Sequence, residues 1–195
     1  MEKQEICNKG VAFTGHRDIL RSKRSDLKQK LSFCIRNLYY KGMVDFYCGA
    51  AWGFDLLAAE VVLSLKSELP AIRLICVIPY RGQSENWSLI EQTRYKRVIS
   101  KADEVVILSE NYFGGCFFRR NDYLVNHSCG IVAYYDGKPK GGTFYTVKKS
   151  PGEKFMGDKP LLLNVVLIRL LFEVTKSFNV NNSLKDLASE DHFFF

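Results

Sequence analysis

The stretch VDFYCGAAWGFDLLAAEVVLSLK, residues 44–66, passes from a strand pattern to a helical one. Val44–Cys48 is a short, mostly apolar run of the kind that forms a strand, and Asp55–Lys66 is long enough for an apolar helix. Between them, Gly49 and Gly53 allow the backbone to turn sharply. A strand, a glycine turn and a helix in this order form the repeating unit of a parallel α/β sheet.

The same order continues in both directions along the chain. Apolar residues recur every three or four positions where helices are predicted, as at Leu27, Leu31 and Ile35, and Gly42 is a natural cap for the end of that helix. We expect strands at Val11–Thr14, Val44–Cys48, Ile72–Ile78, Glu104–Leu108 and Ile131–Tyr135, and helices at about Ser22–Lys41, Asp55–Lys66, Leu89–Ala102, Phe117–Ser128 and Thr143–Ser150.

This alternation predicts an α/β protein, a Rossmann-like three-layer sandwich with helices on both faces of a mostly parallel sheet. The 195 residues, 47% hydrophobic and 25% charged, suit a globular domain. We expect that domain over residues 1–150, followed by a divergent extension over residues 151–195 that is packed on it or partly disordered. The apolar run Leu161–Leu171 would be a buried strand, a helix packed on the sheet, or a surface for homo-oligomer formation.

Several classes of protein do not fit the composition. No run of eighteen apolar residues predicts a membrane span, and the N-terminus MEKQEICNKG lacks the apolar stretch of a signal peptide. The six cysteines form no CxxC pair and no Cys/His cluster at ligand spacing. We therefore expect a cytoplasmic protein with reduced thiols, no metal and no cofactor.

The net charge of +7 is concentrated near the N-terminus. Residues 1–41 hold ten Lys/Arg against four Asp/Glu, whereas residues 42–130 hold nine against ten. A basic helix around RSKRSDLKQK can attract phosphates and bind nucleic acid weakly, but we favour a solvated helix surface. The nearby aromatic residues Phe33, Tyr39 and Tyr40 could stack on bases, but we expect them in the core.

Four polar, glycine-containing stretches follow predicted strands. They are TGHR at 14–17, CGAAWGFD at 48–55, IPYRGQ at 78–83 and YYDGKPKGGT at 134–143. Open α/β sheets bind ligands outside the carboxyl ends of their strands. We expect the four stretches to converge on a binding site at this edge of the sheet, which we name the rim.

The first of these stretches places His16 and Arg17 directly after a strand. Arg17 offers a planar, permanently charged fork that suits phosphate oxygens. His16 can donate a hydrogen bond and change charge near neutral pH, so it is a catalytic candidate. The alternative is that His16 caps the turn and that Arg17 pairs with a carboxylate such as Asp18.

Two glycine turns at the starts of helices predict phosphate sites. In GAAWGFD the first amides of the helix would be unpaired at the positive end of its dipole. Asp55 would be the N-cap or would accept a hydrogen bond from a ribose hydroxyl. In GGT, residues 141–143, Thr143 would cap the helix while its hydroxyl contacts a phosphate. The alternatives are a plain strand-to-helix turn with a capping Asp and a flexible surface loop.

Two arginines and an asparagine interrupt an otherwise apolar helix at RRND, residues 119–122. Neighbouring helical positions point about 100° apart, so Arg119 and Arg120 cannot both face the same partner. One of them would serve the rim while the other is solvated or salt-bridged. Asn121 would be costly to bury without hydrogen-bond partners.

In combination, TGHR, CGAAWGFDLLAAEVVLSLK, LICVIPY, RRNDYLV and a GGT before a helix resemble the SLOG superfamily, especially its YpsA-like branch. The resemblance covers residues 11–150, and the superfamily includes LOG phosphoribohydrolases and Smf/DprA DNA-processing proteins. It implies a sensor or regulatory module that binds a nucleotide-derived ligand, such as ADP-ribose or an NAD-related molecule. The ligand-binding residues implied by position are Gly15, His16, Arg17, Gly49, Gly53, Asp55, Arg120, Asn121, Gly141, Gly142 and Thr143.

The last motif departs from the LOG pattern. LOG hydrolases carry PGGxGTxxE, whose glutamate takes part in N-glycosidic cleavage, whereas this chain has PKGGTFYT with Thr146 at that position. The same hydrolysis is therefore hard to assign. A nucleotide N-glycoside or phosphoribosyl hydrolase using His16 or Asp55 is one alternative function. A DNA-binding protein of the Smf/DprA kind, using the basic N-terminal helix, is the other.

Overall fold

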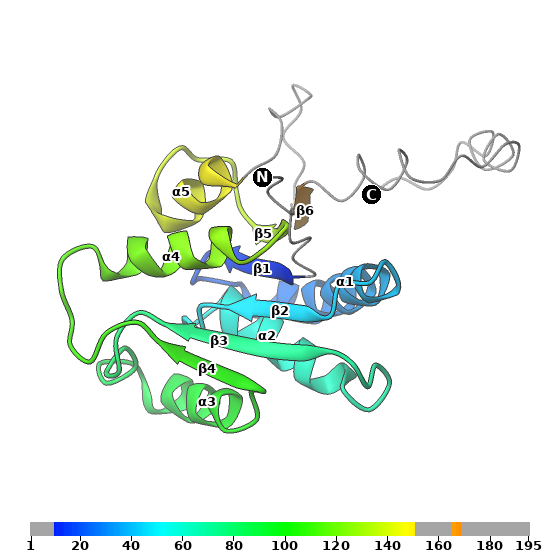
Figure 1. Ribbon diagram of the computed structural model, residues 1–195, viewed down its shortest axis with the longest axis horizontal. Helices are drawn as coiled ribbons and strands as arrows, with labels where there is room; N and C mark the ends of the chain where they lie inside the picture. Colours follow the sequence, from blue (N-terminus) through cyan, green and yellow to red (C-terminus); the bar gives the residue numbers. More distant parts are fainter. Residues whose placement is uncertain (1–9, 151–164, 169–195) are drawn as a thin grey trace, which may run out of the picture.

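The computed structural model describes residues 10–150 and 165–168, in which strands and helices alternate (Figure 1). All the predicted elements are present, and their ends differ from the predicted ones by at most three residues. The elements are β1 (Gly10–Gly15), α1 (Arg21–Tyr40), β2 (Asp45–Cys48), α2 (Phe54–Leu65), β3 (Arg73–Ile78), α3 (Leu89–Ile99), β4 (Glu104–Ile107), α4 (Cys116–Asn126), β5 (Gly130–Tyr134), α5 (Gly141–Lys149) and β6 (Val165–Ile168).

The described strands form one sheet in the order β4-β3-β2-β1-β5-β6. Neighbours from β4 to β5 are parallel, and β6 runs antiparallel to β5 at the edge. The chain adds β2, β3 and β4 on one side of β1 and then crosses back to place β5 on the other. The carboxyl ends of β1 and β5 therefore flank the point where the strand order reverses, which is where open α/β sheets bind ligands.

Helices cover both faces of the sheet. On one face α1 packs beside α2 and α2 beside α3, whereas α4 packs beside α5 on the other face (Figure 1). Each face has its own apolar core: Phe13, Phe46 and Leu57 belong to the first, and Val77 and Leu124 to the second. The Rossmann-like three-layer sandwich predicted from the alternation is confirmed.

Two expectations concern the ends of elements. The C-cap of α1 is Lys41 and not the predicted Gly42, which follows it with φ +88°, a left-handed conformation that favours glycine. Within the apolar run 161–171, residues Val165–Ile168 form β6, which agrees with the strand alternative. The remainder of the extension expected over 151–195 lies outside the described residues.

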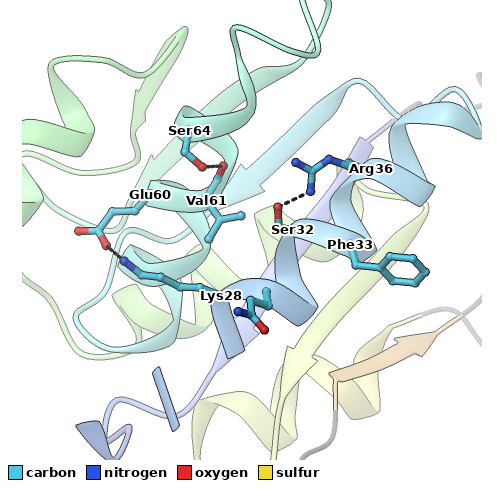
Figure 2. Close-up of a pocket in the computed structure, with 8 residues that line it drawn as sticks. Lys28, Ser32, Phe33, Arg36, Glu60, Val61 and Ser64 are labelled. Carbon is cyan, nitrogen blue, oxygen red and sulfur yellow. Dashed lines mark hydrogen bonds and ion pairs between the residues drawn. The ribbon is translucent and has the colours of Figure 1, made fainter. Parts of the chain in front are cut away.

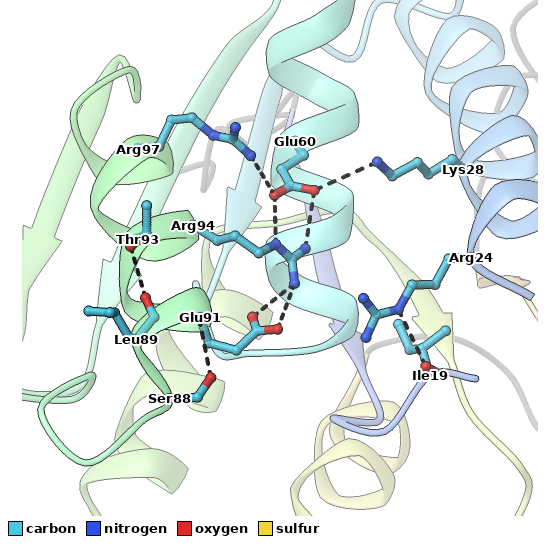
Figure 3. Close-up of polar contacts among 10 residues, drawn as sticks. All are labelled: Ile19, Arg24, Lys28, Glu60, Ser88, Leu89, Glu91, Thr93, Arg94 and Arg97. Carbon is cyan, nitrogen blue, oxygen red and sulfur yellow. Dashed lines mark hydrogen bonds and ion pairs between the residues drawn. The ribbon is translucent and has the colours of Figure 1, made fainter. Parts of the chain in front are cut away.

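Charged pairs contribute to the attachment of α3 to the rest of the domain. The apolar face of this helix is small, since Val98 is its only fully buried residue. The guanidinium of Arg94 donates to both carboxylate oxygens of Glu60 in α2, at 2.9 and 3.1 Å (Figure 3). Arg97 and Lys28 also reach Glu60, at 3.1 and 3.9 Å. The side chains of Arg94 and Glu60 are only 17% and 15% exposed, so this central pair is sheltered from solvent, whereas Arg97 and Lys28 are exposed.

Some general properties follow from the described residues. None of the helices in this part of the chain is long and apolar enough to span a membrane. The same residues contain no cluster of three or more His, Cys, Asp or Glu that could hold a metal ion. Four cysteines of these residues, Cys34, Cys48, Cys76 and Cys116, are buried free thiols. Burial raises the pKa of Cys34 to about 11 and that of Cys76 to about 12, so these thiols stay protonated and pack as small apolar groups.

Candidate ligand-binding site

The TGHR turn after β1 is held by both of its neighbours. The backbone amide of His16 donates to the carbonyl of Tyr134 in β5, and the carbonyl of His16 accepts from the amide of Phe54 in α2, each at 3.1 Å. Gly15 has no room for a side chain, because a Cβ there would lie 2.5 Å from the ring of Phe54. The turn is therefore packed tightly between β5 and α2.

The imidazole of His16 contacts the loop that follows β5. Its Nε2 accepts a hydrogen bond from the backbone amide of Asp136 at 3.0 Å and lies 3.1 Å from the Oδ1 of the same residue. The first contact suits the neutral ring and the second suits the protonated ring. In either charge state His16 bridges the loops after β1 and β5, which agrees with the alternative in which it holds a turn.

The guanidinium of Arg17 lies over an indole ring. Its central carbon is 4.0 Å from the ring centroid of Trp52 in the loop after β2, and Trp52 packs edge-on against Trp87. Because Arg17 is exposed, this cation–π contact positions the guanidinium at the rim and leaves its donors open. Both Arg17 and Asp18 are among the described residues, and no ion pair joins them there, unlike in the alternative considered above.

The turn after β2 packs closely against two arginines, Arg17 and Arg120. Gly53 has φ +89°, and a Cβ there would lie 2.1 Å from the carbonyl oxygen of Arg17. A Cβ on Gly49 would lie 1.7 Å from Nη1 of Arg120. Ala50 also has a positive φ, +49°, which is uncommon for a residue with a side chain. The two glycines are therefore required by close packing within the protein itself.

The start of α2 differs from the open anion site that the sequence predicts. The helix begins at Phe54, and Gly53 is its N-cap, so the expectation that Asp55 caps the helix is wrong. The amide of Phe54 donates to the carbonyl of His16, and the amide of Leu56 donates to the carbonyl of Ala51. The amide of Phe54 is already paired with the TGHR turn and that of Leu56 with the loop after β2, so neither can also hold a phosphate.

Asp55 and Arg120 form a buried charged pair beneath this turn. Their side chains are 7% and 10% exposed, and Nη1 of Arg120 lies 3.7 Å from Oδ2 of Asp55. Burial raises the pKa of Asp55 to about 6, although Arg120, the amide of Ala51 and Arg17 all act to lower it. Burial lowers the pKa of Arg120, and Asp55 opposes that change. A carboxyl group with this pKa can exchange its proton close to neutral pH.

A chain of hydrogen bonds runs from β2 through α4 to α5. Nη1 of Arg120 donates to the carbonyl of Gly49 and Nε donates to Oδ1 of Asn121, both at 2.8 Å. Nδ2 of Asn121 donates to the carbonyl of Gly142 at 3.3 Å. Arg119 is exposed, in agreement with the expectation that the two arginines face different partners. The end of β2 and the start of α5 are thus held at a fixed spacing.

The start of α5 keeps the properties of an anion site. The helix begins at Gly141, which has φ +85°, and its N-cap is Lys140, so the expectation that Thr143 caps it is wrong. No hydrogen-bond acceptor among the described residues pairs with the amides of residues 141–143. The first turn also lacks an acidic residue. The positive end of the helix dipole is therefore open.

Thr146, at the position of the LOG glutamate, lies inside the fold. The residue is fully buried, and its hydroxyl donates to the carbonyl of Gly142 at 2.8 Å. The departure from the LOG pattern is therefore a change in packing as well as in chemistry.

Sequence reasoning missed two supporting side chains, Trp52 and Gln83. Trp52 carries the guanidinium of Arg17, as described above. Gln83 is 4% exposed, and its Nε2 donates to the carbonyl of Gly49 at 3.5 Å. Both residues lie in stretches predicted to form the rim, GAAWGFD and IPYRGQ. The sequence of a loop does not indicate which residue elsewhere in the chain each of its side chains will contact.

Sequence reasoning also missed a group of aromatic rings at the ends of β3 and β4. Tyr80 follows β3, Tyr112 follows β4 and Phe117 lies in the first turn of α4; we name these three residues the aromatic cluster. Ring centroids are 5.5 Å apart for Tyr80 and Tyr112 and 6.1 Å apart for Tyr80 and Phe117. Arg81 and Glu110 join the two loops through a hydrogen-bonded ion pair of 2.6 Å.

A groove of about 440 Å³ lies away from the rim, between α1 and α2 (Figure 2). It contains none of the predicted site residues. Phe33 beside it and Tyr40 farther along α1 are 69% and 73% exposed, so the expectation that they belong to the core is wrong. Both lie on the side of α1 opposite its buried stripe. The groove is lined by Lys28, Gln29, Ser32, Phe33, Arg36, Glu60, Val61 and Ser64.

A mostly parallel sheet with polar, glycine-containing loops at its carboxyl ends and a reversal of strand order at β1 defines a Rossmann-like domain. The sequence profile of the YspA SLOG family matches residues 14–161. The chain belongs to that family.

Relatives with curated sequences carry names that state no activity. The chain is 33% identical over 128 residues to the uncharacterized SPbeta prophage-derived protein YoqJ of Bacillus subtilis, covering 59% of this chain and 75% of that protein. It is 31% identical over 139 residues to a UPF0398 protein of Halalkalibacterium halodurans, covering 70% and 71%. A UPF0398 protein of Shouchella clausii is 31% identical over 124 residues, covering 62% and 66%.

One similar solved structure is DNA processing protein A from Helicobacter pylori, described for its single-stranded DNA binding mode. The TM-score is 0.46 and the sequence identity 22%, over 71% of this chain and 59% of that one. A similarity of this degree says nothing of a shared site or function.

Proposed function

We propose that the protein binds a nucleotide or nucleotide-derived ligand, of the ADP-ribose or NAD-related kind, at the rim, as a sensor or regulatory module. One observation carries the proposal: the hydrogen-bond chain from Gly49 through Arg120 and Asn121 to Gly142. It keeps the open start of α5 beside the turn after β2. Backbone donors and a fixed positive charge thus lie on one edge of the sheet, as phosphate binding requires.

The predicted residues take different roles in this proposal. The amides of Gly141, Gly142 and Thr143 bind a phosphate, and the guanidinium of Arg17 reaches it from the loop after β1. The charge of Arg17 acts on both Asp55 and Arg120, which supports their sharing one region. His16 orients the loop after β5, and Gly15, Gly49 and Gly53 keep the backbone turns closely packed.

A thermal-shift screen tests the proposal directly. A ligand that prefers the folded state raises Tm, so nucleoside monophosphates, ADP, ADP-ribose and NAD are compared at equal concentration. We expect at least one of these compounds to raise Tm. No shift with any of them, and no heat of binding in a calorimetric titration, would contradict the proposal.

Variants of Arg17 then locate the site. Arg17→Lys keeps the charge but loses the planar fork, so binding of the selected nucleotide should weaken. Arg17→Ala should weaken it further, by about 1.5–3 kcal/mol. Arg119→Ala is the matched control. Arg119 is also an exposed arginine, but its neighbour Arg120, and not Arg119 itself, is hydrogen-bonded at the rim. Equal affinity in Arg17→Ala and in the control would place the ligand elsewhere.

Asp55 favours a second candidate, hydrolysis of a nucleotide N-glycosidic or phosphoribosyl bond. A buried carboxyl group with a pKa of about 6 can act as a general acid or base near neutral pH. Incubation with NAD, ADP-ribose and nucleoside monophosphates, followed by detection of released base, tests this activity. Asp55→Asn should abolish the release while ligand still binds. Binding by the wild-type protein without any release favours the sensor.

Exposed aromatic residues on α1 favour a third candidate, weak nucleic-acid binding. Phe33 and Tyr40 can stack on bases beside the lysines of this helix. Titration with a single-stranded oligonucleotide at increasing salt is the test, since affinity carried by phosphate contacts falls steeply with salt. Phe33→Ala should weaken this binding and leave nucleotide binding unchanged. An oligonucleotide affinity that is unaffected by both salt and Phe33→Ala would exclude the candidate.

A further inference from the structure

We infer that the aromatic cluster, Tyr80, Tyr112 and Phe117, is a platform on which the base of the bound nucleotide stacks. The inference rests on the proposed function. It adds where the base of the nucleotide binds, which the phosphate contacts do not determine. The favoured ligand chemistry is a planar heterocyclic base, and a purine in preference to a pyrimidine, because its larger π face stacks over more ring area. Ring stacking of this kind accepts any base and gives affinity more than sequence or atom specificity.

The cluster lies next to the residues that link the turn after β2 to the start of α5, along the same rim. Phe117 precedes Arg120 and Asn121 by three and four residues in α4, so the three side chains occupy one side of the helix. Asn121 also donates to the carbonyl of Gly142 at the start of α5, so this side of α4 leads from the cluster to the proposed phosphate site. A nucleotide with its phosphate at the start of α5 would therefore extend its base towards the cluster.

The middle ring of the cluster also borders the charged part of the rim. Tyr80 follows β3, the neighbour of β2, whose end forms the turn at Gly49. The charge of Arg17 acts on the hydroxyl of Tyr80, opposing the rise in its pKa that burial causes. Tyr80 and Arg17 thus face a common region between the loops after β1 and β3.

The cluster leaves aromatic surface open to a ligand. Tyr112 is 64% exposed, with its ring edge-on to Tyr80 at 80° and tilted from Phe117 by 57°. Each edge-to-face contact covers at most one face of a ring, and Tyr112 keeps ring surface exposed to solvent. The pair formed by Arg81 and Glu110 ties together the loops that carry Tyr80 and Tyr112. A platform fixed before the ligand arrives loses little entropy on binding.

The test compares a ligand that has a base with one that lacks it. ADP and ribose 5-phosphate are titrated calorimetrically into the wild-type protein, Tyr112→Ala and Tyr112→Phe, and etheno-ADP reports stacking through quenching of its fluorescence. We expect Tyr112→Ala to weaken ADP about tenfold, to leave ribose 5-phosphate unchanged and to reduce the quenching. Tyr112→Phe keeps the ring and should keep the affinity. Leu89→Ala, which removes an exposed apolar side chain from α3, is the control and should bind both compounds like the wild type.

The outcomes separate this inference from the proposed function. If the wild-type protein binds ADP and Tyr112→Ala binds it equally well, the base lies elsewhere and the platform is excluded, while nucleotide binding stands. Equal weakening of ADP and ribose 5-phosphate in Tyr112→Ala also excludes a role in base stacking. Failure of the wild-type protein to bind either compound or any nucleotide of the screen contradicts the proposed function itself. Because Tyr112 is exposed, its replacement should leave the fold intact, and circular dichroism of each variant checks this.

Discussion

The glycine turn before α2 and the glycine turn before α5 are similar in sequence and different in structure. Both follow a strand and open a helix at the same rim. At α2 the amides of Phe54 and Leu56 are bonded to carbonyls of the protein, and Gly53 is pressed against the backbone of Arg17. At α5 the first amides have no acceptor among the described residues, and nothing lies within 4 Å of the Cβ position of Gly141.

The difference shows that a glycine turn has two separate uses. Glycine before α2 lets one part of the protein approach another, whereas glycine before α5 leaves room for something from outside. A helix start binds an anion only if its amides remain unpaired after folding. This depends on the loop that packs against the helix, which for α2 is TGHR.

The largest expected effect comes from a substitution that disrupts the glycine turn before α2. Gly53→Val places a β-branched side chain where a Cβ would lie 2.1 Å from the carbonyl oxygen of Arg17, at φ +89°. We expect a loss of more than about 5 kcal/mol in the free energy of unfolding, comparable with the whole stability of a small domain. Gly141→Ala shares the positive φ but has open space, so it should cost only about 1 kcal/mol. Urea denaturation measures both, and similar losses would contradict the comparison.

The next effect removes the connection between the two turns. Arg120→Met keeps an apolar stem but leaves Asp55 buried without its charged partner and leaves the carbonyl of Gly49 without that donor. Loss of one partner of a buried pair costs about 3–5 kcal/mol. Arg119→Met, on the exposed side of the same helix, should change stability by less than about 0.5 kcal/mol. A small effect at Arg120 would mean that the turns are positioned independently.

A smaller effect concerns the pH dependence of the buried pair. Because burial raises the pKa of Asp55 from 3.8 to about 6, the protonated carboxyl favours the folded state. Its stabilising contribution is complete below about pH 4 and is lost as the pH rises through about 6, by at most about 3 kcal/mol. Asp55→Asn should remove this dependence. Urea denaturation of both proteins at several pH values between about 4 and 7 measures it, and parallel curves would show that Asp55 titrates normally.

The smallest expected effect comes from a substitution at the glycine turn before α5. Thr143→Asp adds a carboxylate to the first turn of α5, where a negative charge is favourable, and should stabilise the protein by about 0.3–1 kcal/mol. The same carboxylate competes with a phosphate and should weaken nucleotide binding. Thr143→Asn, which is nearly the same shape without the charge, separates the two effects. If the charged and neutral variants bind the nucleotide equally well, the start of α5 does not hold its phosphate.

Sequence periodicity was sufficient to predict the fold. Apolar spacing in the segment with Leu27, Leu31 and Ile35 marks a helix buried on one side, and the short apolar runs mark buried strands, because burial repeats with the geometry of each element. Helix ends were less accurate. Capping depends on neighbouring loops, and Asp55 and Thr143 both lie in the first turn and not at the cap.

The site was only partly predictable for the same reason. Motif order placed TGHR, the two glycine turns and RRND at the same rim, since all are near the ends of parallel strands or in the helix that crosses them. Some backbone amides are hydrogen-bonded within the protein and cannot bind a ligand. Which amides these are depends on contacts between loops far apart in the chain, such as that of His16 with Phe54. The aromatic cluster brings together three segments, and no local pattern links Tyr80 with Tyr112.

The attachment of α3 has a consequence for how the domain comes apart. Burial alone would raise the pKa of Glu60, but the hydrogen bonds and charges of Arg94 and its neighbours lower it, so this carboxylate stabilises the fold above about pH 4.5 and less in acid. Besides these pairs, α3 is held by Val98, its only fully buried residue, and by the partly buried Tyr95 and Ile99. We therefore expect acid to release α3 first, as a separate cooperative unit. Hydrogen exchange would then reach the amides of α3 at a pH where those of β1 and β2 are still protected.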